Sequence, residues 1–171
     1  MKIKIDWRVI SLSLFVVVLD QATKILTKEF MTLGHSEKIL GDFVRYTYIQ
    51  NTGMAFGIQI GNRLVFTVFS LLASLLILGY LFKARGDKPA VRVALALILG
   101  GAIGNLIDRI FSGAVVDFID VGIGSLRWPV FNVADSAVSI GMILLISVIL
   151  FTKEPEHLSE KQRPEPHFPV D

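Results

Sequence analysis

The sequence predicts an integral membrane protein that is mainly α-helical, with four transmembrane helices and a small β-sheet outside the membrane. The 171-residue chain is 53% hydrophobic, with a mean hydropathy of +0.62. Its apolar residues form four long segments, whereas a soluble domain of this length shows shorter, broken ones. The segments are residues 9–30, 64–82, 90–107 and 131–151. Each approaches the roughly 20 residues that a helix needs to cross about 30 Å of hydrocarbon.

Basic residues precede the first apolar segment, as they do in a secretory signal peptide. It runs, however, into Asp20-Gln21-Ala22-Thr23-Lys24 without a small-residue cleavage site, and three more apolar segments follow. These features favour a retained transmembrane helix over a cleaved leader.

Basic residues predict how the helices are oriented. They gather before the first segment and between the second and third: Lys2, Lys4, Arg8, Lys83, Arg85, Lys88 and Arg92. Because such residues concentrate on the cytoplasmic side, we expect both termini there and residues 31–63 and 108–130 outside. The net charge of +2 and the pI near 9.0 then reflect membrane orientation. No nucleic-acid partner is expected, since no basic stripe with interleaved aromatic residues occurs.

The segment between the first two spans differs in character from the spans. Residues 42–50 are rich in β-branched and aromatic side chains with partial alternation, which predicts a small extracytoplasmic sheet within about residues 31–62. Residues 153–171 carry prolines among alternating charges and are expected to form a disordered cytoplasmic tail. Residues 1–152 would then form a single membrane-embedded domain.

Seven acidic, basic and amide residues that interrupt or end the apolar segments all fall on the predicted outer side. A charge in apolar surroundings costs several kcal/mol, so several charges at one depth favour a shared site. These residues are Asp20, Lys24, Asn105, Asp108, Arg109, Asn132 and Asp135.

Each of these positions also has a purely structural interpretation. Asp20 and Lys24 are four residues apart, and an intrahelical ion pair that helps to shape the site is the favoured interpretation. Arg109 can extend its guanidinium to lipid headgroups, or brace carboxylates and bind substrate backbone. Asn105 can serve only to hydrogen-bond across helices, and Asn51 only to turn the loop before Gly53.

Neither a metal nor a cofactor is expected. The chain has no cysteine, and His35, His157 and His167 are isolated from one another. The glycine-rich residues 100–104 lack the Walker lysine and serine or threonine, and their small size is typical of close helix packing in a bilayer.

Two carboxylates carry the predicted chemistry. Asn132 is expected to cap the last helix, with Asp135 in its first turn, and Asp117 lies among apolar neighbours. If Asp117 packs beside Asp135, the two like charges should share one proton. Such a pair can activate water to hydrolyse a peptide bond. Spacing alone leaves Asp120 as an alternative to Asp117.

Other functional classes fit the sequence less well. No Gly-x-Ser-x-Gly elbow occurs, although a serine–lysine pair that uses Lys24 stays open. A small proton-coupled transporter would also hold intramembrane carboxylates, but no internal repeat is visible. The Gly-x-Gly-Asp signature of presenilin-like proteases is missing, since Gly122-Ile123-Gly124 continues to Ser125.

Five motifs occur in a fixed order along the chain. They are Asp20-Gln21-Ala22-Thr23-Lys24, Asn51-Thr52-Gly53-Met54-Ala55-Phe56, Gly100-Gly101-Ala102-Ile103-Gly104-Asn105-Leu106-Ile107-Asp108-Arg109, Val115-Val116-Asp117-Phe118-Ile119-Asp120 and Phe131-Asn132-Val133-Ala134-Asp135. In this order they resemble the motifs of bacterial lipoprotein signal peptidase, the type II signal peptidase. The resemblance runs from the first predicted span to the last.

The resemblance implies an aspartyl endopeptidase of the bacterial cytoplasmic (inner) membrane. Such an enzyme cuts prolipoproteins immediately before the lipobox cysteine, once that cysteine carries a diacylglyceryl group. The catalytic pair would be Asp117 and Asp135, which selects Asp117 over Asp120. The residues that line or brace the pocket would be Asp20, Lys24, Asn51, Gly53, Asn105, Arg109, Asn132 and Ala134.

The resemblance also implies partners. The family's pocket receives the antibiotic globomycin, and its extracytoplasmic β-cradle corresponds to the strand-like region ending near Phe56. We therefore expect modified prolipoprotein, membrane lipid and globomycin-type inhibitors as ligands. One catalytic set in one chain suggests a monomer.

Overall fold

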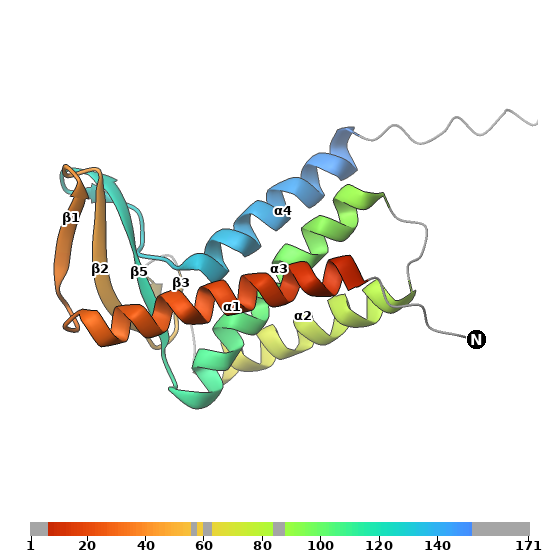
Figure 1. Cartoon of the computed structure of the whole chain (residues 1–171), viewed down its shortest axis with the longest axis horizontal. Helices are drawn as coiled ribbons and strands as arrows, with labels where there is room; N and C mark the ends of the chain where they lie inside the picture. Colours follow the sequence, from red (N-terminus) through yellow and green to blue (C-terminus); the bar gives the residue numbers. More distant parts are fainter. Residues whose placement is uncertain (1–6, 56–57, 60–62, 84–87, 152–171) are drawn as a thin grey trace, which may run out of the picture.

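The computed structural model describes residues 7–55, 58–59, 63–83 and 88–151 (Figure 1). It contains four long helices, α1 (Trp7–Phe30), α2 (Arg63–Lys83), α3 (Pro89–Phe111) and α4 (Val133–Phe151). All four are long and apolar enough to cross a membrane, which confirms the predicted fold class. Phe56 and the predicted tail, residues 153–171, lie outside the described residues.

Helix α3 is the centre of the bundle, and α1, α2 and α4 all pack against it (Figure 1). Small residues allow this close packing, as their sequence predicts. A Cβ atom added to Gly101 would lie 2.3 Å from the backbone oxygen of Ala134 on α4. On the opposite side, Ser13 of α1 donates a hydrogen bond to the carbonyl oxygen of Ala96 at 2.9 Å. The backbones of three helices therefore approach one another directly.

The third helix is longer than the sequence predicts. Its apolar run ends at Ile107, but α3 continues through Asp108 and Arg109 to Phe111. The helix can continue because polar partners lie beside these two side chains. The fourth helix begins at Val133, directly after the predicted cap Asn132.

A four-stranded antiparallel sheet lies at one end of the bundle (Figure 1). Its strands, in spatial order, are β1 (Ser36–Leu40), β2 (Val44–Asn51), β5 (Val115–Ile123) and β6 (Leu126–Arg127). Strands β3 (Met54–Ala55) and β4 (Ile58–Gln59) form a separate pair. The sequence predicted strands only before the second helix, but the sheet also contains β5, which lies between α3 and α4. Gly113 and Gly124, with φ angles of 78° and 57°, flank this strand.

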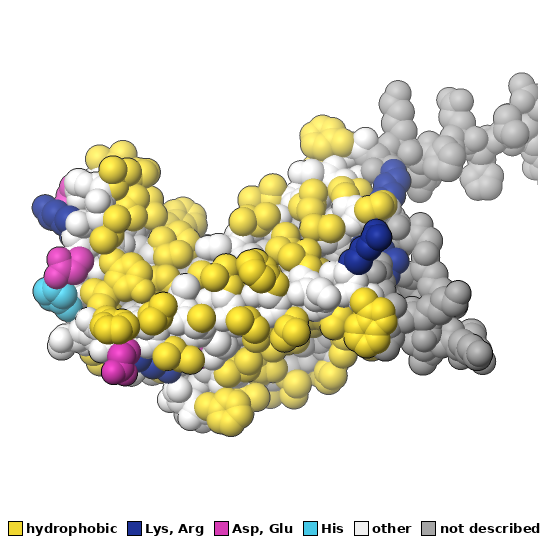
Figure 2. Space-filling view, in the orientation of Figure 1, with side chains coloured by type: hydrophobic (Ala, Val, Ile, Leu, Met, Phe, Trp, Pro, Cys, Tyr) yellow, Lys and Arg dark blue, Asp and Glu magenta, His cyan; other side chains and the backbone are white. Residues whose placement is uncertain are grey.

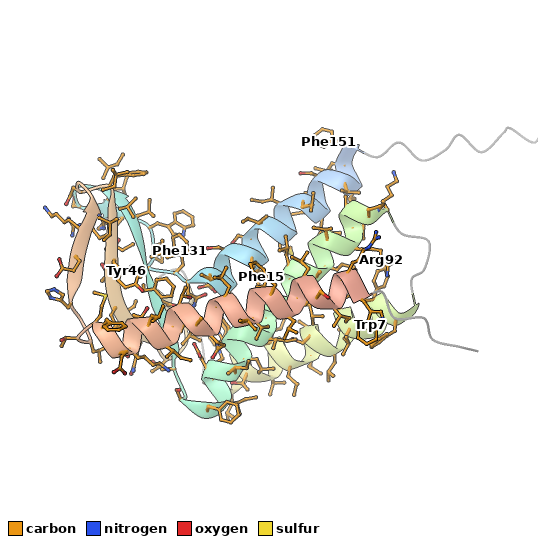
Figure 3. The ribbon with its side chains drawn as sticks, viewed as in Figure 1. Trp7, Phe15, Tyr46, Arg92, Phe131 and Phe151 are labelled. Carbon is orange, nitrogen blue, oxygen red and sulfur yellow. The ribbon has the colours of Figure 1, made fainter. Side chains whose placement is uncertain are left out.

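Aromatic packing fixes the sheet onto the helices. The rings of Tyr46 and Phe118 lie 5.2 Å apart, and the Tyr46 hydroxyl is 2.7 Å from the Thr27 hydroxyl near the end of α1. Figure 3 shows Tyr46 where the sheet meets α1. Strands β2 and β5 are thus held against the ends of the helices that carry the polar residues.

The opposite end of the bundle holds both ends of the described chain. Trp7 and Phe151 lie there, away from the sheet (Figure 3). Basic side chains gather at this end, and hydrophobic side chains cover much of the outside of the helices (Figure 2). Arg8, Lys88 and Arg92 are among the basic residues at the helix ends here. A lipid-facing surface of this kind agrees with four spans.

Replacement of Gly101 by alanine should destabilise the bundle. The added methyl group meets backbone of α4, which cannot move without separating the helices, so we expect a loss of about 1–3 kcal/mol. Gly79→Ala is the matched control, because a Cβ atom at Gly79 meets nothing within 4 Å and alanine favours a helix. Thermal unfolding in detergent would measure both changes. Equal stabilities of the two variants would contradict the packing argument.

Candidate active site

Lys24 of α1 is buried, with only 1% of its side chain exposed. Its ammonium nitrogen lies 2.8 Å from Asp20 Oδ2 and 3.0 Å from Asp108 Oδ2, and it donates to Asn105 Oδ1 at 2.9 Å. Three acceptors match the three N–H donors of an ammonium group. The predicted ion pair between Asp20 and Lys24 is therefore present, and Asp108 extends it to α3.

Asp20 also fixes the start of α4. Its second oxygen accepts a hydrogen bond from the backbone N–H of Ala134 at 2.9 Å. This contact requires Gly104, where a Cβ atom would lie 2.6 Å from Asp20 Oδ2. A single carboxylate thus links α1 to α4 across a glycine of α3.

Asp108 and Gln21 complete this network. The sequence placed Asp108 in the shared polar cluster but not among the pocket residues, and it did not predict Gln21. Asp108 Oδ2 accepts a hydrogen bond from the Val116 N–H at 3.2 Å, which positions the start of β5. The Gln21 amide donates to Asp20 Oδ2 at 3.1 Å and to Asp108 Oδ1 at 3.3 Å. The residue type of Gln21 could have indicated its role, because a side-chain amide within an apolar helix needs hydrogen-bond partners.

Asn132 and Asp135 form a reciprocal cap at the start of α4. The Asp135 N–H donates to Asn132 Oδ1 at 2.9 Å, and the Asn132 N–H donates to Asp135 Oδ2 at 3.2 Å. This is the capping-box pattern, with asparagine and aspartate in place of the usual serine and glutamate. The predicted cap is confirmed, and it fixes the Asp135 carboxylate at the sheet end of α4.

The amide of Asn132 connects this cap to β5. Its Nδ2 donates to Asp117 Oδ1 at 2.7 Å and to Asn105 Oδ1 at 3.2 Å. Asn105 in turn donates to Asp135 Oδ1 at 2.7 Å. Asn132 is fully buried, and the two asparagines together hold buried Asp117 and partly buried Asp135 at one place.

Asp117 lies on β5 with 2% of its surface exposed. Besides Asn132, the Asn51 amide donates to its Oδ2 at 3.1 Å, and Asn51 Oδ1 accepts the N–H of Gly53 at 3.0 Å. Burial raises the pKa of the Asp117 carboxyl from 3.8 to about 7, and the nearby charge of Asp135 acts in the same direction. This carboxyl therefore retains a proton through most of the acidic range.

Arg109 approaches the two carboxylates from α3. Its Nη1 donates to Ser70 Oγ at 3.2 Å, and its guanidinium lies 5.8 Å from the centre of the Phe66 ring. Its positive charge acts on Asp135 and Asp117. Of the two orientations left open by the sequence, the structure has the guanidinium turned to the site.

Asp120 is buried elsewhere in the sheet. It pairs with Arg127 Nε at 2.6 Å and accepts the Thr47 hydroxyl at 2.9 Å. Asp117 and Asp120 are three residues apart on one strand, so their side chains point to opposite faces. Only Asp117 contacts Asn132.

Nine of the ten predicted site residues are thus joined by hydrogen bonds or an ion pair at the sheet end of the bundle, and the tenth, Arg109, acts on Asp135 and Asp117 through its charge. The hydrogen bonds link α1, α3, β2, β5 and α4, which are far apart in sequence. A serine–lysine pair does not fit, because the three N–H groups of Lys24 already have non-serine partners. Within the described residues, no three histidine, aspartate or glutamate side chains are arranged to hold a metal ion.

Comparison with known families agrees with this geometry. Residues 12–151 match the family described as signal peptidase (SPase) II. The chain belongs to the signal peptidase II family.

Similar proteins include several lipoprotein signal peptidases. That of Syntrophus aciditrophicus is 44% identical over 146 residues, covering 82% of this chain and 90% of its own. That of Halothermothrix orenii is 47% identical over 133 residues, covering 78% and 88%. That of Staphylococcus aureus is 36% identical over 153 residues, covering 90% and 93%. The relatedness to signal peptidase II therefore extends over nearly all of the membrane region.

A solved structure gives the same result for the fold. A bacterial membrane enzyme superposes with a TM-score of 0.78 at 35% identity, covering 88% of this chain and 92% of its own. The fold of this member of the signal peptidase II family is therefore one already seen in a bacterial membrane enzyme.

The raised pKa of Asp117 predicts how the stability of the protein depends on pH. The folded protein holds a proton on Asp117 up to about pH 7, whereas an unfolded aspartate loses it near 3.8. The folded state therefore binds more protons between these values, and stability falls as pH rises through this window.

Asp117→Asn removes this titration. As pH rises from 4 to 7, the stability of the variant relative to the wild type should increase by about 2–4 kcal/mol, because only the wild type loses stability over this range. Thermal unfolding in detergent at a series of pH values would measure the difference. Stability curves that run parallel across this range would contradict the assignment.

Proposed function

We propose that this chain is a membrane aspartyl endopeptidase that removes signal peptides from prolipoproteins. The observation that carries the proposal is the pairing of buried Asp117 with partly buried Asp135, held by Asn132 and Asn105 at one end of a membrane-spanning bundle. Membership of a peptidase family makes the chain a hydrolase. The aspartyl mechanism is the chemistry that these two side chains support.

The two carboxyl groups would divide the work of peptide hydrolysis. Asp135 accepts a proton from a water molecule, whose oxygen then forms a bond to the scissile carbonyl carbon. Asp117, protonated up to about pH 7, donates its proton to the developing oxyanion. When the intermediate collapses, the C–N bond breaks, the leaving nitrogen takes the proton from Asp135, and a hydroxyl group of the intermediate returns its proton to Asp117 as the product carbonyl forms.

A lipid-anchored substrate suits this location. We propose cleavage immediately before the lipobox cysteine of a diacylglyceryl-modified prolipoprotein. The lipid group would remain in the bilayer against the exposed apolar surface of the helices, while the scissile bond reaches the carboxylates at the bundle's end. Lipid is therefore both the surroundings of the enzyme and part of its substrate. The remaining predicted site residues would brace this pocket, which globomycin-type inhibitors would also occupy.

The charge distribution supports an orientation. Arg8, Lys88 and Arg92 lie at the end of the bundle opposite the site, and basic residues favour the cytoplasmic side. We therefore place the carboxylates near the extracytoplasmic face of the bacterial cytoplasmic (inner) membrane, with both termini in the cytoplasm. Residues 1–152 would form one peptidase domain and act as a monomer, because one chain supplies the whole set of site residues.

Incubation of the purified protein with two precursors tests the substrate. The diacylglyceryl-modified prolipoprotein should be cleaved before its cysteine, and the same precursor without the lipid should remain intact. Mass spectrometry of the products would locate the cleaved bond. Equal cleavage of both precursors would reject the requirement for lipid, and no cleavage of either would reject the function.

Substitution of the carboxylates tests the mechanism. Asp117→Asn and Asp135→Asn should each lower kcat by at least about 100-fold, because each removes a group that transfers protons. Asp120→Asn is the matched control, since Asp120 lies on the same strand but pairs with Arg127. It should retain far more activity per folded molecule. Near-normal turnover by either of the first two variants would exclude the pair.

A further inference from the structure

Helix α2 contains none of the five motifs, yet it contacts the site through Arg109. The Arg109 Nη1 donates to the hydroxyl of Ser70 at 3.2 Å, and its guanidinium lies 5.8 Å from the centre of the Phe66 ring. Ser70 and Phe66 are one helical turn apart, so they share a face of α2. One hydrogen bond and one aromatic face therefore hold the same cation.

The position of this guanidinium matters because its charge acts on Asp135 and Asp117. An arginine side chain has many rotamers, and ordering it costs entropy. If another residue already fixes the guanidinium before the substrate binds, this entropy need not be lost during the reaction. The aromatic face adds attraction for the cation and limits its movement toward solvent or lipid.

We propose that Ser70 and Phe66 of α2 are positioning residues that hold Arg109 against the Asp117 and Asp135 pair. This proposal rests on the proposed function of that pair. Neither residue would touch the reacting atoms, and both would act through the guanidinium. The second transmembrane helix would then contribute to catalysis as well as spanning the bilayer.

A purely structural role for the same contacts makes a different prediction. If Ser70 only ties α2 to α3, its loss should lower stability and leave turnover per folded molecule unchanged. Ser74 offers a comparison on the same helix. It is buried and donates to the carbonyl oxygen of Ser70 at 2.7 Å, within its own helix.

Four variants, assayed with the diacylglyceryl-modified precursor, separate these possibilities. Ser70→Ala should lower kcat about tenfold, as expected for the loss of a hydrogen bond to a charged group. Ser70→Thr retains the hydroxyl and should restore most of the activity. Phe66→Leu should lower kcat by a smaller factor, and Ser74→Ala should match the wild type. Thermal unfolding in detergent would confirm that the folded fractions are equal.

The outcomes distinguish this proposal from the proposed function. If the wild type cleaves the precursor and Ser70→Ala has the same kcat, the proposed role of α2 is overturned and the peptidase function stays intact. Equal losses in Ser70→Ala and Ser74→Ala, or no recovery in Ser70→Thr, would also overturn it. A wild type that cleaves no precursor would remove the proposed function and this inference together. Loss in Ser70→Ala, recovery in Ser70→Thr and full activity in Ser74→Ala would support it.

Discussion

The charge of Lys24 is the constraint on which the site's architecture depends. A buried ammonium group must be paired and fully hydrogen-bonded, or its burial becomes prohibitively expensive. Asp20 and Asp108 supply the charges, and each carboxylate also binds a backbone N–H of another element. Neutralising one lysine therefore aligns α1 and α3 with the start of α4 and of β5. Buried ion pairs of this kind are better understood as fixing an arrangement than as adding stability.

The four carboxylates of this region fall into two classes by their partners. Asp20 and Asp108 form ion pairs with the Lys24 ammonium group. Asp117 and Asp135 instead accept hydrogen bonds from the amides of Asn51, Asn132 and Asn105. An amide orients a carboxyl group without supplying a full opposite charge, so such a group can still exchange a proton. The carboxylates paired with the ammonium group thus have a structural role, whereas those bound by amides are the ones that we propose carry out the reaction.

Features that depend on local sequence pattern could be predicted from the sequence. Apolar length predicted four helices, and residue type at one position predicted the cap at Asn132. A charge inside a membrane needs a partner, so polar residues at a similar depth in the bilayer were predicted to lie together in one site. The strand containing Asp117 was missed, since nine mostly apolar residues do not by themselves distinguish a strand from other buried segments. The contact between Arg109 and Ser70 joins two helices, and a common residue such as serine gives no sign of it in the sequence.

The spacing of Asp20 and Lys24 also has a consequence for biosynthesis. A helix that enters the bilayer during translation does so before the later helices exist, and an isolated charge at its centre opposes insertion by about 2.5–3.5 kcal/mol. These two side chains lie one turn apart, so they neutralise each other within α1 alone. The polar pair in the first helix can therefore enter the bilayer as a neutral unit before the other helices are present. Asp108 joins the pair only when α3 arrives, so the network is assembled in the order in which the chain is made.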